Sequence, residues 1–330
     1  MLSNLEIGVY FSANDVVYDW TIAFLNSFRK FNPDLRLILI PFNDKCDRLL
    51  QLQNKYNFEV YIDPSFDRLE AIGQAFELGH TPTGPYWFRR YAAFWGTLDR
   101  FLYLDARQVI LADLTPFLTA LDEFSFDFLY YDCAIDQVYE LGEFRQQLLR
   151  QGKGRGFNSG RWAARKGLFS IDEFEQLATE ALKIREQLNP RNTDQAFINY
   201  CCDMKPVVAG HLAEVIGGIC QNGWARQSGH IYQGNNKYYR WDYGGLDHKK
   251  QIILVHWAGY HWNDFFPQKF ILLLFFVKHQ NYVSLLLIYV TLLFVSLPRF
   301  LLKSLISQRN LNMTYHSLKP KVLNVKMHTS

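Results

Sequence analysis

Four polar side chains of this chain stand where apolar, strand-like runs end. Two are small hydrogen-bonding groups, one is a carboxylate and one is an imidazole: Ser12, Asn14, Asp105 and His256. In open α/β sheets, ligands bind beyond the carboxyl ends of the strands, so such side chains meet at one edge. A carboxylate and an imidazole that meet there can also hold a divalent cation. The pattern therefore predicts a ligand site at the carboxyl edge of a sheet.

Asp and Asn are also the usual residues of turns, so any one of these positions alone indicates only a turn. Further polar residues at predicted strand ends are Asp15, which follows the same run as Ser12 and Asn14, and Asn43, Asp44 and Asp63, which follow two other runs. The prediction of a site rests on the convergence of the whole set.

The elements that must position these residues alternate along the first half of the chain. Four apolar runs have the character of buried strands: Ile7–Phe11, Leu35–Ile40, Phe58–Ile62 and Arg100–Asp105. Stretches with helical spacing lie between them: Trp20–Phe28, Leu49–Tyr56 and Tyr86–Trp95. This alternation predicts βαβ units and an α/β fold with a mostly parallel sheet. A later strand is expected at 251–256, whereas Gly217–Gly245 shows few regular signals.

Composition is that of a folded chain. Hydrophobic residues make up 49% of the 330 residues and charged residues 20%, which excludes a disordered or fibrous protein. The net charge of only +3 gives no reason to expect nucleic acid as a partner. The five cysteines form no CxxC pair, which favours reduced, mostly buried thiols over a disulfide framework.

Four short motifs occur in order along residues 1–264. They are Tyr103-Leu104-Asp105 followed by Asp113-Leu114, then Phe157-Asn158-Ser159-Gly160, then Asp194-Gln195, and finally His256-Trp257-Ala258-Gly259. An arginine-bearing stretch, Tyr86–Tyr91, precedes the first. Together these motifs resemble the retaining, glycogenin-like family of nucleotide-sugar glycosyltransferases, which have the GT-A fold. Each motif alone is weak, and their order makes the resemblance fairly specific.

The resemblance implies an enzyme that transfers a sugar from a nucleotide diphosphate sugar, a uridine diphosphate sugar by analogy, to a glycan or a lipid-linked acceptor. It implies Mn²⁺ or Mg²⁺ held by Asp105 and His256. It implies donor contacts from Ser12, Asn14, Arg89, Arg90, Asp105 and Arg107. Asn158, Asp194 and Gln195 would lie near the transferred sugar as catalytic residues.

The sequence departs from the family at two positions. Arg107 stands where the family has the second Asp of its DxD motif, and Trp262 stands where the family has a Lys. Three interpretations follow: Arg107 replaces the metal at the diphosphate, Asp105 and His256 still hold a metal, or the site is inactive. The functional alternative is therefore a catalytically inactive, membrane-tethered protein that binds nucleotide sugars.

The last part of the chain differs in character. Residues 265–330 contain no acidic residue and eight of the 35 basic ones, which leaves 27 basic against all 32 acidic residues in 1–264. Asn281–Leu297 is uncharged, close to the length of about 20 apolar residues that spans a bilayer. We therefore expect an α/β domain over 1–264 and a helical, membrane-associated tail over 265–330. Contacts through 265–309 would anchor it, monotopic or re-entrant, on the cytoplasmic face of a membrane.

Overall fold

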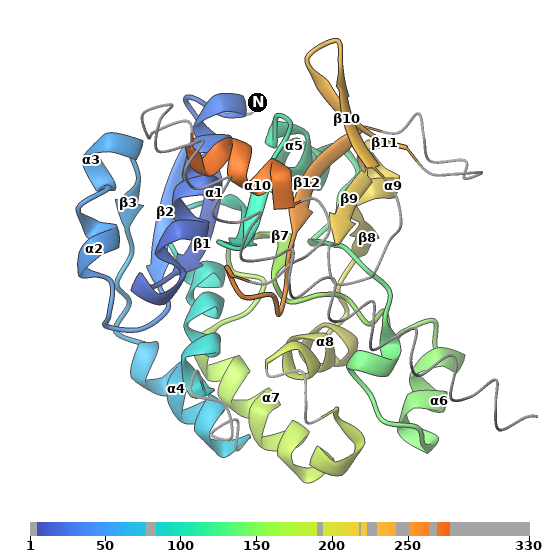
Figure 1. Cartoon of the computed structure of the whole chain (residues 1–330). Helices are drawn as coiled ribbons and strands as arrows, with labels where there is room; N and C mark the ends of the chain where they lie inside the picture. The colour runs from blue at the N-terminus through green and yellow to red at the C-terminus, as the bar shows by residue number, and fades with distance from the viewer. Residues whose placement is uncertain are drawn as a thin grey trace, which may run out of the picture. The chain divides into compact units, whose positions relative to one another are not determined.

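The computed structural model describes residues 5–76, 84–189, 194–217, 219–222, 230–241, 251–263 and 269–277. All described helices and strands lie in one compact unit, Met1–Trp262 with Pro267–Lys278. A seven-stranded sheet runs through it in the order β3-β2-β1-β4-β7-β6-β8 (Figure 1). Its strands are β1 (Ile7–Ala13), β2 (Arg36–Pro41), β3 (Glu59–Val60), β4 (Arg100–Asp105), β6 (Phe128–Tyr130), β7 (Arg161–Arg165) and β8 (Ala209–His211).

The large sheet is mixed and mostly parallel. β1 pairs in parallel with both β2 and β4, β2 with β3, and β6 with β8. β7 is antiparallel to its two neighbours, β4 and β6. The predicted α/β fold is therefore confirmed, and the strands β1, β2 and β4 were predicted within a few residues of their bounds.

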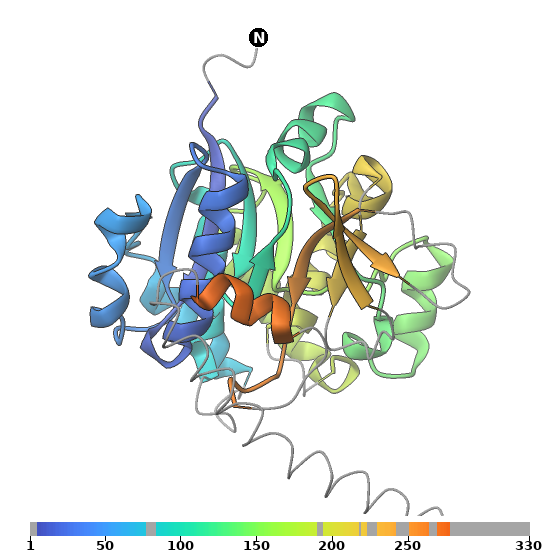
Figure 2. The ribbon, with the colours of Figure 1, turned by 45° about the horizontal axis from the view of Figure 1, so that its top comes forward.

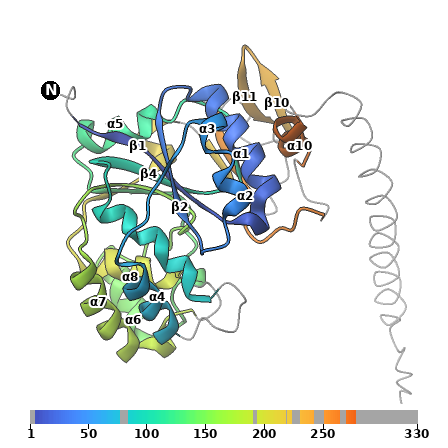
Figure 3. The same cartoon turned by 90° about the vertical axis from the view of Figure 1, so that its left-hand side faces the viewer.

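Both faces of this sheet are covered by helices. Along β1, Val9 and Phe11 pack into one core cluster with Phe24 of α1, whereas Tyr10 packs into the other with Tyr91. This is why the strands read as unbroken apolar runs. Figure 3 shows α4, α7 and α8 on one side of the sheet and α1 on the other.

The helices lie between the strands along the chain, and α10 follows the last strand. The α-helices are α1 (Tyr18–Phe31), α2 (Asp47–Leu50), α3 (Gln53–Tyr56), α4 (Phe66–Ala75), α5 (Thr115–Glu123), α6 (Glu143–Arg150), α7 (Ile171–Lys183), α8 (Gln195–Met204), α9 (Leu212–Ile216) and α10 (Lys269–Val277). The 3₁₀ helices are η1 (Asp15–Val17), η3 (Gly84–Trp95), η4 (Ile135–Gln137) and η5 (Arg185–Gln187); η3 has 12 residues and the others have 3 each. The single helix expected over Leu49–Tyr56 is broken into α2 and α3.

A second, three-stranded sheet contains β5 (Gln108–Ile110), β12 (Ile252–His256) and β9 (Ile219–Asn222). A hairpin of β10 (His230–Gly234) and β11 (Lys237–Trp241) lies within the stretch where few regular signals were expected. Its two-residue loop, Asn235 and Asn236, has φ angles of 51° and 60°. Asn tolerates this left-handed region, so the Asn-Asn pair is the hairpin signal that the sequence interpretation missed.

The helix α10 belongs to the α/β unit. It packs against α1 (Figures 1 and 2). The side chains of Ile271, Leu272 and Phe275 are buried. The Asn26 side chain of α1 donates a hydrogen bond to the carbonyl of Phe275 at 2.8 Å. The boundary expected after residue 264 therefore precedes a helix that shares the core of the α/β unit.

The remainder of the expected tail, residues 278–330, lies outside the described residues. Within the parts of the chain that the structure describes, no helix combines the length and the apolar character needed to cross a bilayer.

Candidate functional site

The site lies where the order of the large sheet changes direction. From β1 the chain passes to β2 and β3 on one side, and it returns to β4 on the other side of β1. Because β2 and β4 are both parallel to β1, their connecting segments separate at the carboxyl edge and leave a crevice there. Ser12 and Asp105 are paired in register across this point.

A cleft of about 140 Å³ opens at this edge. It is lined by five residues that the sequence predicted: Ser12, Asn14, Asp105, Arg107 and His256. The Asn14 side chain caps η1 by accepting a hydrogen bond from the Val16 amide at 3.2 Å, and it donates to Asn43 at 3.3 Å. The loop after β1 is thus held in place by the same residue that lines the cleft.

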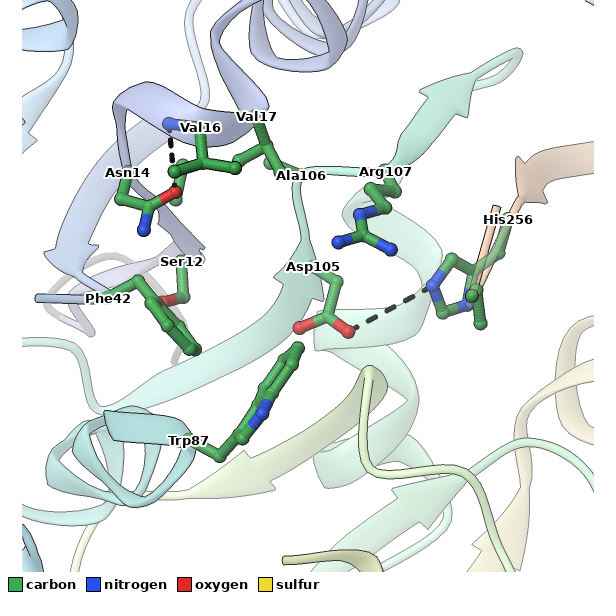
Figure 4. A pocket seen from close by; sticks show the side chains of 13 residues that line it. Ser12, Asn14, Val16, Val17, Phe42, Trp87, Asp105, Ala106, Arg107 and His256 are labelled. Atoms are coloured by element: carbon green, nitrogen blue, oxygen red, sulfur yellow. Dashed lines mark hydrogen bonds and ion pairs between the residues drawn. The ribbon is translucent and has the colours of Figure 1, made fainter. Parts of the chain in front are cut away.

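The second sheet brings His256 to the end of β4. β5 begins directly after Arg107, and β12 pairs with it antiparallel, so that His256 lies opposite Gln108. The Trp257 amide donates to the Arg107 carbonyl at 3.0 Å. As a result, Nε2 of His256 lies 3.9 Å from Oδ2 of Asp105 (Figure 4). This pairing joins residues about 150 positions apart in the sequence.

His256 is a neutral imidazole in this site. Burial lowers its pKa to about 3, and the positive charges of Arg161, Arg107 and Arg90 act in the same direction, against the opposing effect of Asp105. Its Nδ1 atom is buried and has no hydrogen-bond partner among the described residues.

Gly160 allows three of these groups to converge. A Cβ at this position would lie 2.5 Å from Oδ2 of Asp105, 2.9 Å from Cε1 of His256 and 3.0 Å from Oδ1 of Asn158. No side chain fits in that space, which explains the glycine that follows Asn158 and Ser159. The predicted residue Asn158 is thus placed beside the carboxylate and the imidazole, and its Oδ1 accepts a hydrogen bond from the Gly160 amide at 2.9 Å.

Arg90 is buried directly beside Asp105. Its Nη2 lies 3.4 Å from Oδ1 of Asp105, and its Nε lies 3.6 Å from Oδ2 of Asp194. Nη1 donates to the Ser159 carbonyl at 2.9 Å. The guanidinium lies 4.7 Å from the centroid of the Trp87 ring.

Arg89 points elsewhere. Its guanidinium pairs with Asp44, at 2.9 Å, and with Glu70, and it does not line the cleft. A 3₁₀ helix has three residues per turn, so residues i and i+3 share a face. In η3 this places Arg90 over Trp87 and Arg89 over Tyr86, on different faces. The sequence interpretation left open which arginine reaches the site. In the structure Arg90 lies beside Asp105 without lining the cleft, and its contact with a donor stays a prediction.

Asp194 and Gln195 lie behind the cleft and do not line it. Asp194 is fully buried, and Tyr91 donates a hydrogen bond to its Oδ2 at 2.5 Å. Gln195 accepts from the Ser159 amide at 3.2 Å. Here both residues support Arg90 and the segment that ends at Gly160. Their contact with a transferred sugar stays a prediction.

Sequence reasoning missed the apolar wall of the cleft, which contains Trp87, Phe42 and Val16. The rings of Phe42 and Trp87 meet edge to face with centroids 4.8 Å apart. Figure 4 shows Trp87 on the opposite side of Asp105 from Arg107. An aromatic residue three positions before a site arginine was the available signal.

The charges around Asp105 determine whether the implied Mn²⁺ or Mg²⁺ fits. Oδ1 of Asp105 accepts a hydrogen bond from Tyr103 at 2.8 Å and faces Arg90. Arg107 lines the same cleft, where a dication would meet a second guanidinium. Two like unit charges 4 Å apart repel by about 4 kcal/mol at an effective dielectric constant near 20.

Like the charges, the number of available ligands does not favour a divalent cation in this cleft. Among the described residues, no three His, Cys, Asp or Glu side chains gather as a metal site. One carboxylate and one imidazole flanked by two guanidinium groups do not fit a tightly held divalent cation, which prefers several oxygen ligands.

Comparison with known proteins agrees with this fold. No protein-family model and no curated protein matches the sequence. Among solved structures, the chain is similar to the galactosyltransferase LgtC in complex with donor and acceptor sugar analogs, with a TM-score of 0.55 and 14% identity over 83% of this chain and 96% of that one.

Two further solved structures have lower TM-scores. The bifunctional glycosyltransferase WbbM has a TM-score of 0.49 and 12% identity over 86% of this chain and 52% of that one. Mouse xyloside xylosyltransferase 1 has a TM-score of 0.49 and 14% identity over 77% of this chain and 98% of that one. The conclusion rests on the similarity to LgtC, which shows that the chain has a GT-A-like glycosyltransferase fold.

Proposed function

We propose that this chain is a glycosyltransferase that takes a sugar from a nucleotide diphosphate sugar, with uridine diphosphate sugars as the first class to test. The acceptor is a glycan or a lipid-linked sugar, and the transferred sugar keeps its anomeric configuration. One observation carries the proposal. The carboxylate of Asp105, the neutral imidazole of His256 and the guanidinium of Arg107 line a cleft at the switch point of a GT-A-like sheet, and the buried Arg90 lies beside Asp105.

The reaction requires charge stabilisation more than covalent chemistry. The bond between sugar C1 and the diphosphate oxygen breaks, and its electron pair stays on that oxygen. The acceptor hydroxyl oxygen forms the new bond to C1, and its proton passes to the released diphosphate. Fixed positive groups aimed at the developing charge lower the barrier, and among the described residues Arg107 is the cationic side chain that lines this cleft.

The neighbouring groups position the donor. Tyr103 and Arg90 hold Oδ1 of Asp105, a residue that lines the cleft, and its Oδ2 lies beside His256. An anionic carboxylate suits the hydroxyl groups of a sugar, for which it is a hydrogen-bond acceptor. Trp87 and Phe42 supply an apolar wall against which a ring can stack. Buried polar atoms are normally hydrogen-bonded, and Nδ1 of His256 has no partner within the described part of the chain, which supports a ligand as its partner.

A membrane-bound acceptor is proposed from composition. Seven of the eight basic residues of the tail follow α10, with no acidic residue among them. Each Lys or Arg near an anionic lipid surface contributes about 1 kcal/mol, so this segment favours the cytoplasmic face of a membrane. Such an anchor would bring lipid-linked sugars to the cleft.

The test is a screen of sugar nucleotides by thermal shift, followed by assays for donor hydrolysis and transfer. A donor at 100 times its dissociation constant should stabilise the protein by about 2.7 kcal/mol. Binding with turnover supports the enzyme, and the anomeric proton signals of the product establish retention or inversion. Binding without hydrolysis or transfer would favour the alternative, an inactive binding protein. No shift with any nucleotide diphosphate would overturn both.

A further inference from the structure

We infer that Arg107 binds the diphosphate of the donor in the place where the glycogenin-like family, which this sequence resembles, uses a divalent cation. Donor binding by this chain then needs no metal. The inference rests on the proposed function and specifies how that site recognises its ligand. It starts from the lack of fit between the cleft and a dication.

The first step is position. Arg107 stands two residues after Asp105, in the short link between β4 and β5, and it lines the cleft together with Asp105 and His256. Figure 4 shows its guanidinium directed toward the Asp105 carboxylate and the His256 ring. The backbone there is fixed on both sides, because the Trp257 amide donates to the Arg107 carbonyl at 3.0 Å and the Asp105 amide donates to the Gly160 carbonyl at 2.9 Å.

The second step is hydrogen-bond capacity. A guanidinium has five N–H donors. Within the described residues, Arg107 uses one of them, from Nη1 to the Tyr260 carbonyl at a long 3.4 Å. Among the described residues Arg107 also forms no ion pair within 4 Å, whereas Arg89 and Arg90 each contact two carboxylates. Arg107 is therefore the cation of the cleft that has donors left for a ligand.

The third step is charge. The nearby Asp105 is already engaged by Arg90 and Tyr103 on its Oδ1 atom. At His256 the positive charges of Arg161, Arg107 and Arg90 act against the negative charge of Asp105 alone. Such positive surroundings suit a diphosphate and repel a dication. A planar guanidinium also binds two phosphate oxygens at once. A side-chain carboxylate can bind a phosphate only through a metal ion.

The experiment measures uridine diphosphate binding by calorimetry to the full chain, once with EDTA and once with Mn²⁺. The wild-type dissociation constant should be the same in both solutions. Arg107→Ala should weaken binding by about tenfold to a hundredfold in both, because a charged hydrogen bond is lost. Arg107→Asp should lose binding in EDTA and regain part of it with Mn²⁺, because the second carboxylate is restored.

Direct titration with Mn²⁺ in the absence of nucleotide gives a readout that does not depend on the donor. Wild type should bind Mn²⁺ at least about tenfold more weakly than Arg107→Asp does, in keeping with the removal of one like charge. Arg150→Asp, at the exposed end of α6, changes charge by the same amount away from the cleft and should leave both titrations unchanged. Thermal unfolding of each variant checks that it is folded.

The outcomes separate the two proposals. Wild-type binding that EDTA abolishes and Mn²⁺ restores would overturn the inference and leave the proposed function standing. Equal binding by wild type and Arg107→Ala would likewise overturn it. If wild type binds no nucleotide diphosphate under either condition, both the proposed function and the inference fail.

Discussion

Nε of Arg90 and Oδ2 of Asp194 lie 3.6 Å apart, with side-chain exposures of only 2% and 1%. The same guanidinium reaches Asp105 at 3.4 Å on its other side. Arg90 therefore links a fully buried carboxylate to one that lines the cleft. A buried cation between two anions is held rigidly, which fixes the orientation of Asp105 before any ligand arrives.

Asp105→Asn should weaken binding of the nucleotide sugar by about tenfold to a hundredfold without unfolding the protein, because a charged hydrogen bond to a sugar hydroxyl is lost. The substitution removes the charge while keeping the shape, and the side chain is 20% exposed, so packing changes little. The measurement is nucleotide-sugar binding by calorimetry together with circular dichroism. Asp34→Asn is the matched control, because this exposed carboxylate precedes β2 at the opposite edge of the sheet. Wild-type affinity in the Asp105 variant would remove this residue from the site.

Asp194→Asn should act on stability first and on the cleft second. Removing one partner of a buried ion pair costs about 3 to 5 kcal/mol, because the other charge stays buried without compensation. Here Asp105 still faces Arg90, so we expect the lower end of that range. Urea denaturation gives the free energy of unfolding, and Asp105→Asn should cost clearly less. Equal costs for the two variants would contradict the linking role of Arg90.

The strands up to β4 could be predicted from the sequence because each is an apolar run that ends at a polar residue. Asp105 and Ser12 are examples, and their register follows from parallel pairing of adjacent strands. The place of His256 at the end of a strand was also predicted from its apolar run, and its role as a metal ligand came from the resemblance. Its position beside Asp105 depends on the antiparallel pairing of β12 with β5, a three-residue strand that no local sequence pattern predicts.

The distinction between Arg89 and Arg90 had no sequence signal. Neighbouring residues on a helix point in different directions, and which direction meets the cleft depends on how η3 packs. Asp44 and Glu70, from other parts of the chain, take up Arg89. The burial of Asp194 was equally hidden, because its position before α8 also fits a helix cap.

His256 should make the folded state less stable in acid. Its pKa is about 3 in the folded protein and about 6.5 in an unfolded chain, so between these values only the unfolded state binds the proton. Stability therefore falls as the pH falls through this window. Relative to His256→Gln, wild type should lose about 2 kcal/mol of unfolding free energy from pH 7 to pH 5.

Urea denaturation at the two pH values measures this difference. His261→Gln removes an exposed histidine from the same segment and serves as the control. If wild type and His256→Gln lose stability in parallel, the imidazole is not buried in its neutral form.

Truncation after Val277 should release the protein from membranes and leave the α/β unit folded, whereas truncation after Asp264 should also destabilise it. The first cut keeps α10, whose Ile271, Leu272 and Phe275 are buried against the α/β unit. The second removes them, at about 1.5 to 3 kcal/mol for each buried side chain, together with the acceptor of the Asn26 hydrogen bond. Both cuts remove the basic, apolar segment that follows α10.

Flotation with vesicles that contain anionic lipid measures membrane binding, and urea denaturation measures the stability of each form. The full chain should float with such vesicles and float less at high salt, because screening weakens the attraction of Lys and Arg to the surface. The form cut after Val277 should stay in solution with wild-type stability. Flotation of that form, or no flotation of the full chain, would remove the membrane from the proposed function. Equal stability of the two truncated forms would show that α10 contributes little to the core, although its apolar side chains are buried.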